Sequence, residues 1–399
     1  MKKRTLLKLV TLMLSLVLVL SVIGCGSSDD KDSKDSKEAS ETEGKAADDS
    51  SESKDDAKKD GFVIGFSNGY WGNTWRAQMV DDFEKEIQKY IDEGIVSEYM
   101  VSNSENDATE QLNQINSMID SGVDAIMIDP VSPTTVQSAV EKAIAQGILV
   151  VITNDPAAYE NTVCVAGNNY AWQKIQVKWL VEQLDGKGDI VEISGVPGNA
   201  ADTLRQDANK DVLADYPDIN ILGSAPGSWS QTEAQSVMTT FLSTYENIDA
   251  VLAQDVMAEG ILKAYENAGK DVPVMTGDYT KSFFNVWQEN PDMNTIGVPY
   301  APGNAVVALD VTVRLLQGKT IKEEVLVANP FDENMINTIM VDPPYVVTKD
   351  GDQNAPWMEG LRGSKAITLE EAVELLKDSP DTAALDGWLS AEEADELFE

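Results

Sequence analysis

The sequence predicts an α/β protein with two doubly wound lobes, each built on a parallel sheet with helices on both faces. Three observations carry this prediction. Short, β-branched apolar runs alternate with longer amphipathic segments, and the same alternation begins again near residue 190. The apolar runs are continuous, which is typical of strands that are buried on both faces. About 340 residues follow residue 60, which is enough for two domains of about 100–200 residues each.

The first 25 residues have the pattern of a secretory signal. A basic start precedes an apolar run at residues 9–20, which is shorter than the roughly 20 residues that a membrane-spanning helix needs. Small residues follow, and the segment closes on Cys25. It resembles a bacterial lipoprotein signal, in which residues 1–24 are removed and the cysteine is lipidated. The alternative is an ordinary signal peptide with a chance cysteine.

Residues 25–60 are predicted to form a lipidated cysteine followed by a disordered acidic linker. After Cys25 the segment contains no aromatic residue and no Val, Ile or Leu, and consists almost entirely of Ser, Asp, Glu, Lys, Gly and Ala. Such a composition buries too little apolar surface to offset the entropy of ordering. We therefore expect an extracytoplasmic protein that is lipid-anchored to the outer face of the cell membrane.

The first lobe is predicted from four strands and three helices. The strands are expected at 62–66, 95–101, 125–128 and 148–152, and the helices at 73–90, 107–121 and 133–146. In the first of these helices Met79, Phe83 and Ile87 fall on one face at the helical spacing. Asp107 is placed to cap the second helix, and Gly122 to end it.

The second lobe repeats the alternation. Its strands are expected at 190–193, 221–223, 251–253 and 272–276, and its helices at 200–214, 231–245 and 256–268. Two further helices are expected near the C-terminus, an amphipathic one at 369–377 and an acidic one at 390–398.

Composition excludes several classes of function. The net charge of −38 disfavours binding of nucleic acid or of anionic lipid by bulk charge. The chain has no histidine, which excludes histidine-based catalytic triads and histidine-ligated metals. If Cys25 is lipidated, Cys164 has no partner for an intrachain disulfide and is expected to be a small buried hydrophobe. We expect no cofactor.

Polar and aromatic residues gather where the predicted strands end. They are Asn73, Trp75, Asp129, Asn154, Asp155, Arg205, Trp229, Gln254, Asp255 and Asp278. In open α/β sheets, ligands bind outside the carboxyl ends of the strands. Carboxylates, amides and an arginine can bind hydroxyl groups, while aromatic rings cover the apolar faces of a sugar ring. The pattern therefore favours a cleft for a small polyhydroxy ligand.

Each of these residues also has a purely structural interpretation. Asp129 and Asp155 could cap the helices that follow them. Trp75 could belong to the core, and Arg205 could pair with a carboxylate on its own solvated helix. The same chemistry at five strand ends in two lobes favours a binding site.

Residues 61–327 resemble the ribose/galactose-like, sugar-binding group of the type I periplasmic-binding-protein superfamily. The resemblance lies in the order and spacing of the runs at 111–131, 150–155, 198–205, 253–255 and 277–278. It implies that the ligand contacts are Asn73, Trp75, Asp155, Arg205, Trp229, Asp255 and Asp278, with Asp129 as a weaker candidate. Two positions depart from the pattern, because Pro156 stands where an arginine is frequent and Asp255 where an asparagine is frequent. Several carboxylates around Arg205 favour a neutral or cationic ligand.

The resemblance also implies the domain organisation. The type I fold joins two lobes by a hinge that the chain crosses three times, here near 166–169, 297–300 and 324–328. The expected N-terminal lobe is 61–168 plus 299–325, and the C-terminal lobe is 169–298 plus 326–345. A C-terminal extension at 346–399 has no assigned role. Residues 350–354 suggest a calcium loop, but Ala355 and Leu361 replace the required Gly and Glu, so no metal site is predicted.

The predicted function is capture of a sugar or polyol between the lobes by a monomeric solute-binding lipoprotein, and its delivery to the permease of an ABC importer. The alternative is a ligand-sensing subunit for a membrane histidine kinase or chemoreceptor. A surface hydrolase would need a carboxylate pair such as Asp155 and Asp278, but the resemblance implies a protein that is not an enzyme. A DNA regulator is disfavoured because the sequence shows no basic helix-turn-helix and carries an export signal.

Overall fold

The structure is a computed structural model that describes residues 61–351 and 354–399. All the described residues belong to one compact unit. The expected signal peptide, the lipidation site Cys25 and the linker lie outside the described residues. Within the described ranges, none of the helices has the length and apolar character required to cross a membrane.

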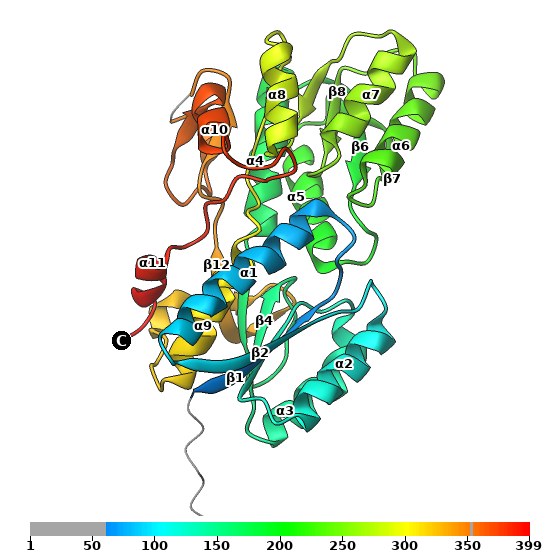
Figure 1. Ribbon diagram of the computed structural model, residues 1–399. Coiled ribbons are helices and arrows are strands. Elements are labelled where there is room, and N and C mark those ends of the chain that lie inside the picture. Colours follow the sequence, from blue (N-terminus) through cyan, green and yellow to red (C-terminus); the bar gives the residue numbers. More distant parts are fainter. Residues whose placement is uncertain (1–60, 352–353) are drawn as a thin grey trace, which may run out of the picture. The chain divides into compact units, whose positions relative to one another are not determined.

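The first lobe is built on a seven-stranded sheet with the order β11-β12-β5-β4-β3-β1-β2 (Figure 1). Every neighbouring pair is parallel except β11 with β12. The strands are β1 (Phe62–Asn68), β2 (Val96–Asn103), β3 (Ala125–Ile128), β4 (Leu149–Asn154), β5 (Val163–Gly167), β11 (Leu326–Asn329) and β12 (Asp332–Val341). The helices are α1 (Thr74–Asp92), α2 (Ala108–Asp120), α3 (Pro133–Ala145) and α9 (Asn304–Leu316).

The second lobe is built on a five-stranded parallel sheet with the order β10-β9-β8-β6-β7. Its strands are β6 (Gly188–Ser194), β7 (Ile219–Pro226), β8 (Ala250–Ala253), β9 (Val274–Thr276) and β10 (Thr295–Ile296). Its helices are α4 (Asn169–Gln183), α5 (Ala200–Leu213), α6 (Gln231–Thr244), α7 (Ala258–Ala268) and α8 (Lys281–Glu289). The two doubly wound lobes that the sequence predicts are thus confirmed.

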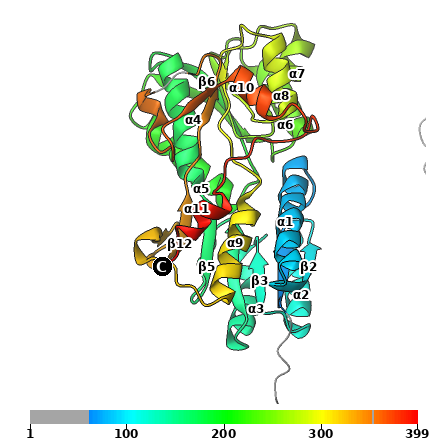
Figure 2. The same cartoon turned by 60° about the vertical axis from the view of Figure 1, so that its left-hand side comes forward.

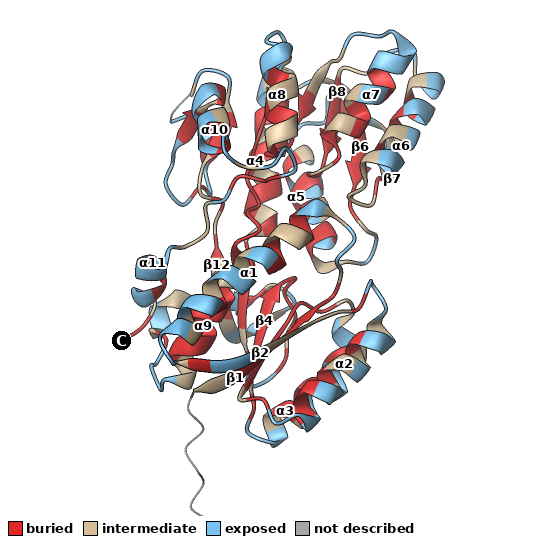
Figure 3. Cartoon of the chain, viewed as in Figure 1, coloured by how far each residue is buried: buried red, intermediate tan, exposed pale blue. Residues whose placement is uncertain are grey.

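Burial on both faces explains the continuous apolar strands. All four residues of β3 are buried: Met127 packs in one core cluster, while Ile126 and Ile128 pack in another that includes residues of α2 and α3. Figure 3 shows the strands mostly as buried and the outer faces of the helices as exposed. Cys164 is fully buried in β5, and burial raises the pKa of its thiol to about 12, as expected of an unreactive hydrophobe.

The expected boundary of the lobes near residue 326 is wrong. β11 and β12 form a hairpin on the first sheet, and β12 pairs in parallel with β5, with Thr338 opposite Cys164 and Val341 opposite Gly167. Residues 326–341 therefore belong to the first lobe. The physical reason is that β12 covers the open edge of β5, whose backbone groups would otherwise be left unpaired. Beyond this hairpin the chain reaches the second lobe, where Val347 forms a bridge with Gly297.

The C-terminal extension contacts both lobes (Figures 1 and 2). It contains β13 (Val346–Thr348), β14 (Ala366–Thr368), α10 (Leu369–Leu375) and α11 (Ala391–Asp395), and α10 packs against α8 of the second lobe. The chain then returns to the first lobe, where Asp395 accepts a hydrogen bond of 2.7 Å from Nε of Arg314. Between these points the indole N–H of Trp388 donates to the carbonyl of Ala301.

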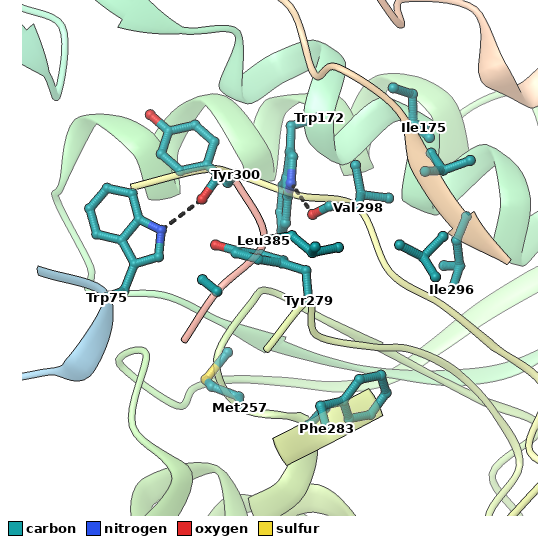
Figure 4. Packing of buried hydrophobic residues seen from close by; sticks show 14 of the residues in the cluster. Trp75, Trp172, Ile175, Met257, Tyr279, Phe283, Ile296, Val298, Tyr300 and Leu385 are labelled. Carbon is teal, nitrogen blue, oxygen red and sulfur yellow. Dashed lines mark hydrogen bonds between the residues drawn. The ribbon is translucent and has the colours of Figure 1, made fainter. Parts of the chain in front are cut away.

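Leu385 of this extension lies in the main core cluster, near Trp172 and Tyr279 (Figure 4). It is 2% exposed, and its amide donates to the carbonyl of Tyr279 at 2.9 Å. We expect Leu385→Ala to lower the free energy of unfolding by about 2–5 kcal/mol in chemical denaturation, because it leaves a cavity in a packed core. Leu375→Ala is the matched control: this leucine belongs to the same extension but is 63% exposed, so its loss should cost little. Equal effects of the two changes would contradict the packing described.

Candidate functional site

The candidate site is a pocket between the two lobes at the carboxyl ends of their strands. Its cavity volume is about 40 Å³. It is lined by residues from both lobes and from the segment that joins them: Asn73, Trp75, Arg76, Asn154, Asp155, Ala201, Arg205, Trp229, Asp255, Val256 and Tyr300. Six of the eight residues expected from the sequence are in this group, and Asp129 and Asp278 are not.

The first turn of α1 supplies one wall of the pocket. The side chain of Asn73 caps the helix by accepting a 2.8 Å hydrogen bond from the amide of Arg76. Trp75 is buried, and its indole N–H donates to the carbonyl of Tyr300 at 2.7 Å (Figure 4). The two rings stack with centroids 5.7 Å apart. Trp75 is therefore a fixed aromatic surface, held by the crossing segment.

Arg76 anchors the carboxylates of the first lobe. It forms ion pairs with Asp129 and with Oδ2 of Asp155, the latter at 3.1 Å. The Asp129 side chain is only 1% exposed and lies behind Arg76, out of contact with the pocket. Asp129 is not a helix cap, because Ser132 caps α3. Its charge is thus compensated by Arg76, which sequence reasoning did not select.

Arg205 has the corresponding place in the second lobe. It is 2% exposed, so it does not lie on a solvated helix face. Its Nη1 pairs with Oδ1 of Asp255 at 2.7 Å and its Nε donates to Asn169 at 2.9 Å. The guanidinium also lies over the ring of Trp172, 4.0 Å from its centroid. Burial, the largest single effect, lowers the pKa of Arg205, but the charge of Asp255 acts together with Tyr300, Tyr279 and the hydrogen bond to Asp255, and the net shift of the pKa is upward.

Trp229 lies close to Arg205, and its position depends on an unusual backbone. Its φ is 54°, and that of Ser228 is also 54°, a region that non-glycine residues adopt at some cost. The indole N–H donates to Oε1 of Gln254 at 2.9 Å. A Cβ at Gly195 would come within 2.3 Å of the Trp229 ring, so this residue must be glycine for the ring to lie there.

Asp155 connects the two lobes. Besides its pair with Arg76, its Oδ2 accepts a hydrogen bond of 2.9 Å from Nδ2 of Asn199. Asn199 caps α5 in the second lobe, whereas Asp155 follows β4 in the first. The bond between these two side chains therefore closes the cleft at one side of the pocket.

Asp278 is buried behind the pocket. It is fully inaccessible and accepts a 2.9 Å hydrogen bond from the amide of Ala258, the first residue of α7. Burial raises the pKa of its carboxyl well above the usual range, and the negative charge of Asp255 raises it further. Asp255 itself is held by two groups: Arg205 pairs with its Oδ1, and the hydroxyl of Tyr279 donates to its Oδ2 at 2.6 Å. Asp278 therefore binds the start of α7 and is not part of the pocket lining.

The raised pKa of Asp278 predicts a pH-dependent stability. Because the folded-state pKa lies above the unfolded value of about 3.9, this group favours folding most below pH 4. That contribution is lost as the pH rises through the folded-state pKa. We expect Asp278→Asn, which keeps an acceptor for Ala258 without the charge, to gain stability relative to wild type between pH 4 and pH 8. Chemical denaturation across this range measures it, with the exposed Asp381 changed to Asn as the control. A constant difference across the range would contradict the prediction.

The arrangement suits a compact, uncharged, hydroxyl-rich ligand. Each lobe presents one guanidinium that is already paired with a carboxylate, and each presents an indole ring. Paired groups of this kind can donate to and accept from hydroxyls, while the rings cover C–H surfaces. Among the residues that the structure describes, no group of three acidic or cysteine side chains is placed to hold a metal ion.

A match to a known protein family identifies the family to which this chain belongs. Residues 64–320 match the periplasmic binding protein domain. The chain belongs to this family. The resemblance noted from the sequence is therefore confirmed.

Relatives of this periplasmic binding protein include transporter proteins that bind sugars and polyols. This chain is 30% identical over 242 residues to the xylitol-binding protein of Mycolicibacterium smegmatis, and the aligned region covers 58% of this chain and 68% of that protein. It is 29% identical over 223 residues to the ribose import binding protein of Bacillus subtilis, covering 55% of this chain and 70% of that protein. Both relatives are named as binding proteins, and the second as an import binding protein.

Solved structures support the fold. The ABC transporter solute binding protein from Thermobispora bispora matches with a TM-score of 0.65 at 24% identity, over 83% of this chain and 99% of that one. A solute binding protein from Bacillus halodurans with bound myo-inositol matches with a TM-score of 0.59 at 24% identity, over 65% of this chain and 91% of that one. At such identities the likeness concerns the fold alone.

Five residues that line the pocket of this periplasmic binding protein were not among the expected ligand contacts. They are Arg76, Asn154, Ala201, Val256 and Tyr300. Asn154 was named at a strand end but not as a contact, whereas Arg76 and Val256 directly adjoin expected contacts and would have been found by including their neighbours. Tyr300 lies in the crossing segment, where no strand-end pattern marks it.

Proposed function

We propose that this protein is an extracytoplasmic, monomeric solute-binding lipoprotein. It captures a neutral sugar or polyol between its lobes and delivers it to the permease of an ABC importer. The observation that carries the proposal is the pair of arginine–carboxylate contacts, one from each lobe, that face one pocket beside Trp75 and Trp229. The names of the relatives, which include a xylitol-binding and a ribose import binding protein, agree with this ligand class.

The charges of the pocket favour a neutral ligand. Arg76 is compensated by Asp129 and Asp155, and Arg205 by Asp255. An anionic ligand would have to displace one of these carboxylates and leave it buried without a partner, which is costly. A hydroxyl can instead join an existing pair, because it donates to a carboxylate and accepts from a guanidinium.

Binding requires that the lobes separate and close again. A cavity of about 40 Å³ has room for a few water molecules at most. The form described here is therefore too closed to admit a sugar. Opening breaks the hydrogen bond between Asp155 and Asn199, and a ligand that contacts both lobes stabilises the closed form. The ligand drives closure only if its affinity for the closed form is greater than its affinity for the open form.

The lipid anchor and the transport role rest on further observations. The basic, apolar and small-residue order that ends at Cys25 supports lipidation, and the acidic linker after it supports a tether to the membrane surface. Membership of the periplasmic binding protein family supports an extracytoplasmic location. The names of the transporter relatives support a permease as the partner.

A thermal-shift panel tests the proposed function. Residues 61–399 would be heated with xylitol, D-ribose, L-arabinose, D-galactose, myo-inositol, D-galacturonic acid and ribose 5-phosphate, each at 5 mM. We expect at least one neutral compound to raise the unfolding midpoint, because a ligand that binds only the folded state stabilises it by RT ln(1 + [L]/Kd). The two acids should have no effect. A response to the acids alone, or to none of the panel, would count against the proposal.

A further inference from the structure

We propose that a groove beside the pocket is a second subsite, which accepts a ring or apolar substituent attached to the sugar or polyol. This inference rests on the proposed function and extends it to substituted ligands such as glycosides. The groove has a cavity volume of about 300 Å³. It is therefore much roomier than the pocket itself, and it is open to solvent.

The groove is continuous with the pocket. Asp155 lines both of them, and on α5 the neighbouring residues Ala200 and Ala201 line the groove and the pocket respectively. The hydrogen bond from Asn199 to Asp155 therefore stands at their junction. A ligand that replaces this one hydrogen bond can extend from the pocket into the groove without displacing any ion pair.

Aromatic rings on the first-lobe side of the groove suit a ring substituent. Tyr159 is buried, and its hydroxyl donates to the carbonyl of Pro133 at 2.6 Å, which fixes the ring against the start of α3. Phe331 lies at the turn between β11 and β12 and is 46% exposed. It belongs to neither hydrophobic core cluster. Phe331 and Tyr159 line the same groove, so the exposed ring is available for contact with a substituent that enters it.

The turn that carries Phe331 is anchored. The amide of Phe331 donates to Oδ1 of Asn329 at 3.1 Å. Asn329 is 2% exposed, and its Nδ2 donates to the carbonyl of Ala157 at 3.1 Å. Ala157 itself lines the groove. The hairpin turn is thus tied to a segment that also lines the groove, which fixes the backbone that carries Phe331.

The groove also has polar groups on its rim. Gln137 on α3 and Thr203 on α5 are both exposed and line it from the first and the second lobe. An apolar floor with a few polar groups at the edge is the usual construction of a small-molecule subsite. The chemical class that fits is an O-substituted sugar or polyol, in which the parent ring lies in the pocket and the substituent lies against Phe331.

Titration calorimetry with matched ligands tests the proposal. The neutral panel compound with the largest thermal shift would be compared with its methyl and phenyl O-derivatives, in both anomers where it is a sugar. We expect at least one phenyl derivative to bind about 2- to 10-fold more tightly than its methyl counterpart, the gain expected from one aromatic contact. Phe331→Ala should abolish this difference and leave the affinity for the parent compound unchanged. Gln137→Trp, which fills the groove, should exclude the phenyl derivative alone.

Ile336→Ala is the matched control. Ile336 lies on the same hairpin and is 56% exposed, but it is not part of the groove, so this change should preserve the phenyl preference. If the parent compound binds and every substituted derivative fails, the subsite is wrong while the proposed function stands. A phenyl preference that survives Phe331→Ala would also overturn the subsite. If no neutral compound binds at all, the proposed function falls and the subsite with it.

Discussion

Replacing Arg205 by Ala is expected to weaken ligand binding by at least about 30-fold. A hydrogen bond to a charged group contributes about 1.5–3 kcal/mol, and each 1.4 kcal/mol is about tenfold in affinity. Arg205 lines the pocket and is 2% exposed, and its loss also leaves Asp255 without the guanidinium that compensates its charge beside the ligand. Calorimetry with the neutral compound that gives the largest thermal shift measures the loss.

The control for this change is a second buried arginine. Arg314 is 6% exposed and pairs with Asp310 and Asp395, but it lies on α9 of the first lobe and does not line the pocket. Arg314→Ala should therefore destabilise the fold and leave the affinity unchanged. Arg205→Lys should bind with intermediate affinity, because lysine keeps the charge but loses the planar array of donors. Equal affinity losses in the two alanine variants would show that the effect is one of folding.

The fold and most of the pocket could be predicted because their signals are local. Buried strands such as β3 are continuous apolar runs, and the polar residues that follow them are visible in the sequence. Asp155 and Asp255 were found in this way. The rule fails for Asp129 and Asp278, which also follow strands. Asp129 pairs with Arg76, Asp278 accepts a hydrogen bond from the amide of Ala258, and neither lines the cavity.

The missed features depend on contacts between distant parts of the chain. The edge pairing of β12 with β5 joins residues about 175 positions apart, and nothing in the pattern of Asp332–Val341 shows which sheet it extends. The return of the C-terminal extension rests on single contacts such as those of Trp388 with Ala301 and Asp395 with Arg314. Arg76 was not selected because its role depends on Asp129, which follows a different strand.

The pairing of Arg76 with Asp129 gives the second large prediction. We expect Arg76→Met to lower the free energy of unfolding by about 3–5 kcal/mol at pH 7, the usual cost of leaving a buried charge without its partner. The Asp129 side chain is 1% exposed, and its other polar contact is with Nδ2 of Asn154 at 3.4 Å, which is too weak to compensate a full charge. Chemical denaturation of the ligand-free protein measures the loss.

A double-mutant cycle separates the charge from the packing. In Arg76→Met/Asp129→Asn both charges of this pair are gone and the volumes are nearly kept, so the part of the loss that the unpaired Asp129 causes should return, whereas Asp155, the other partner of Arg76, stays charged. If the double variant is no more stable than Arg76→Met, the loss comes from packing around the arginine. In that case Asp129 does not depend on Arg76 for its place behind the pocket.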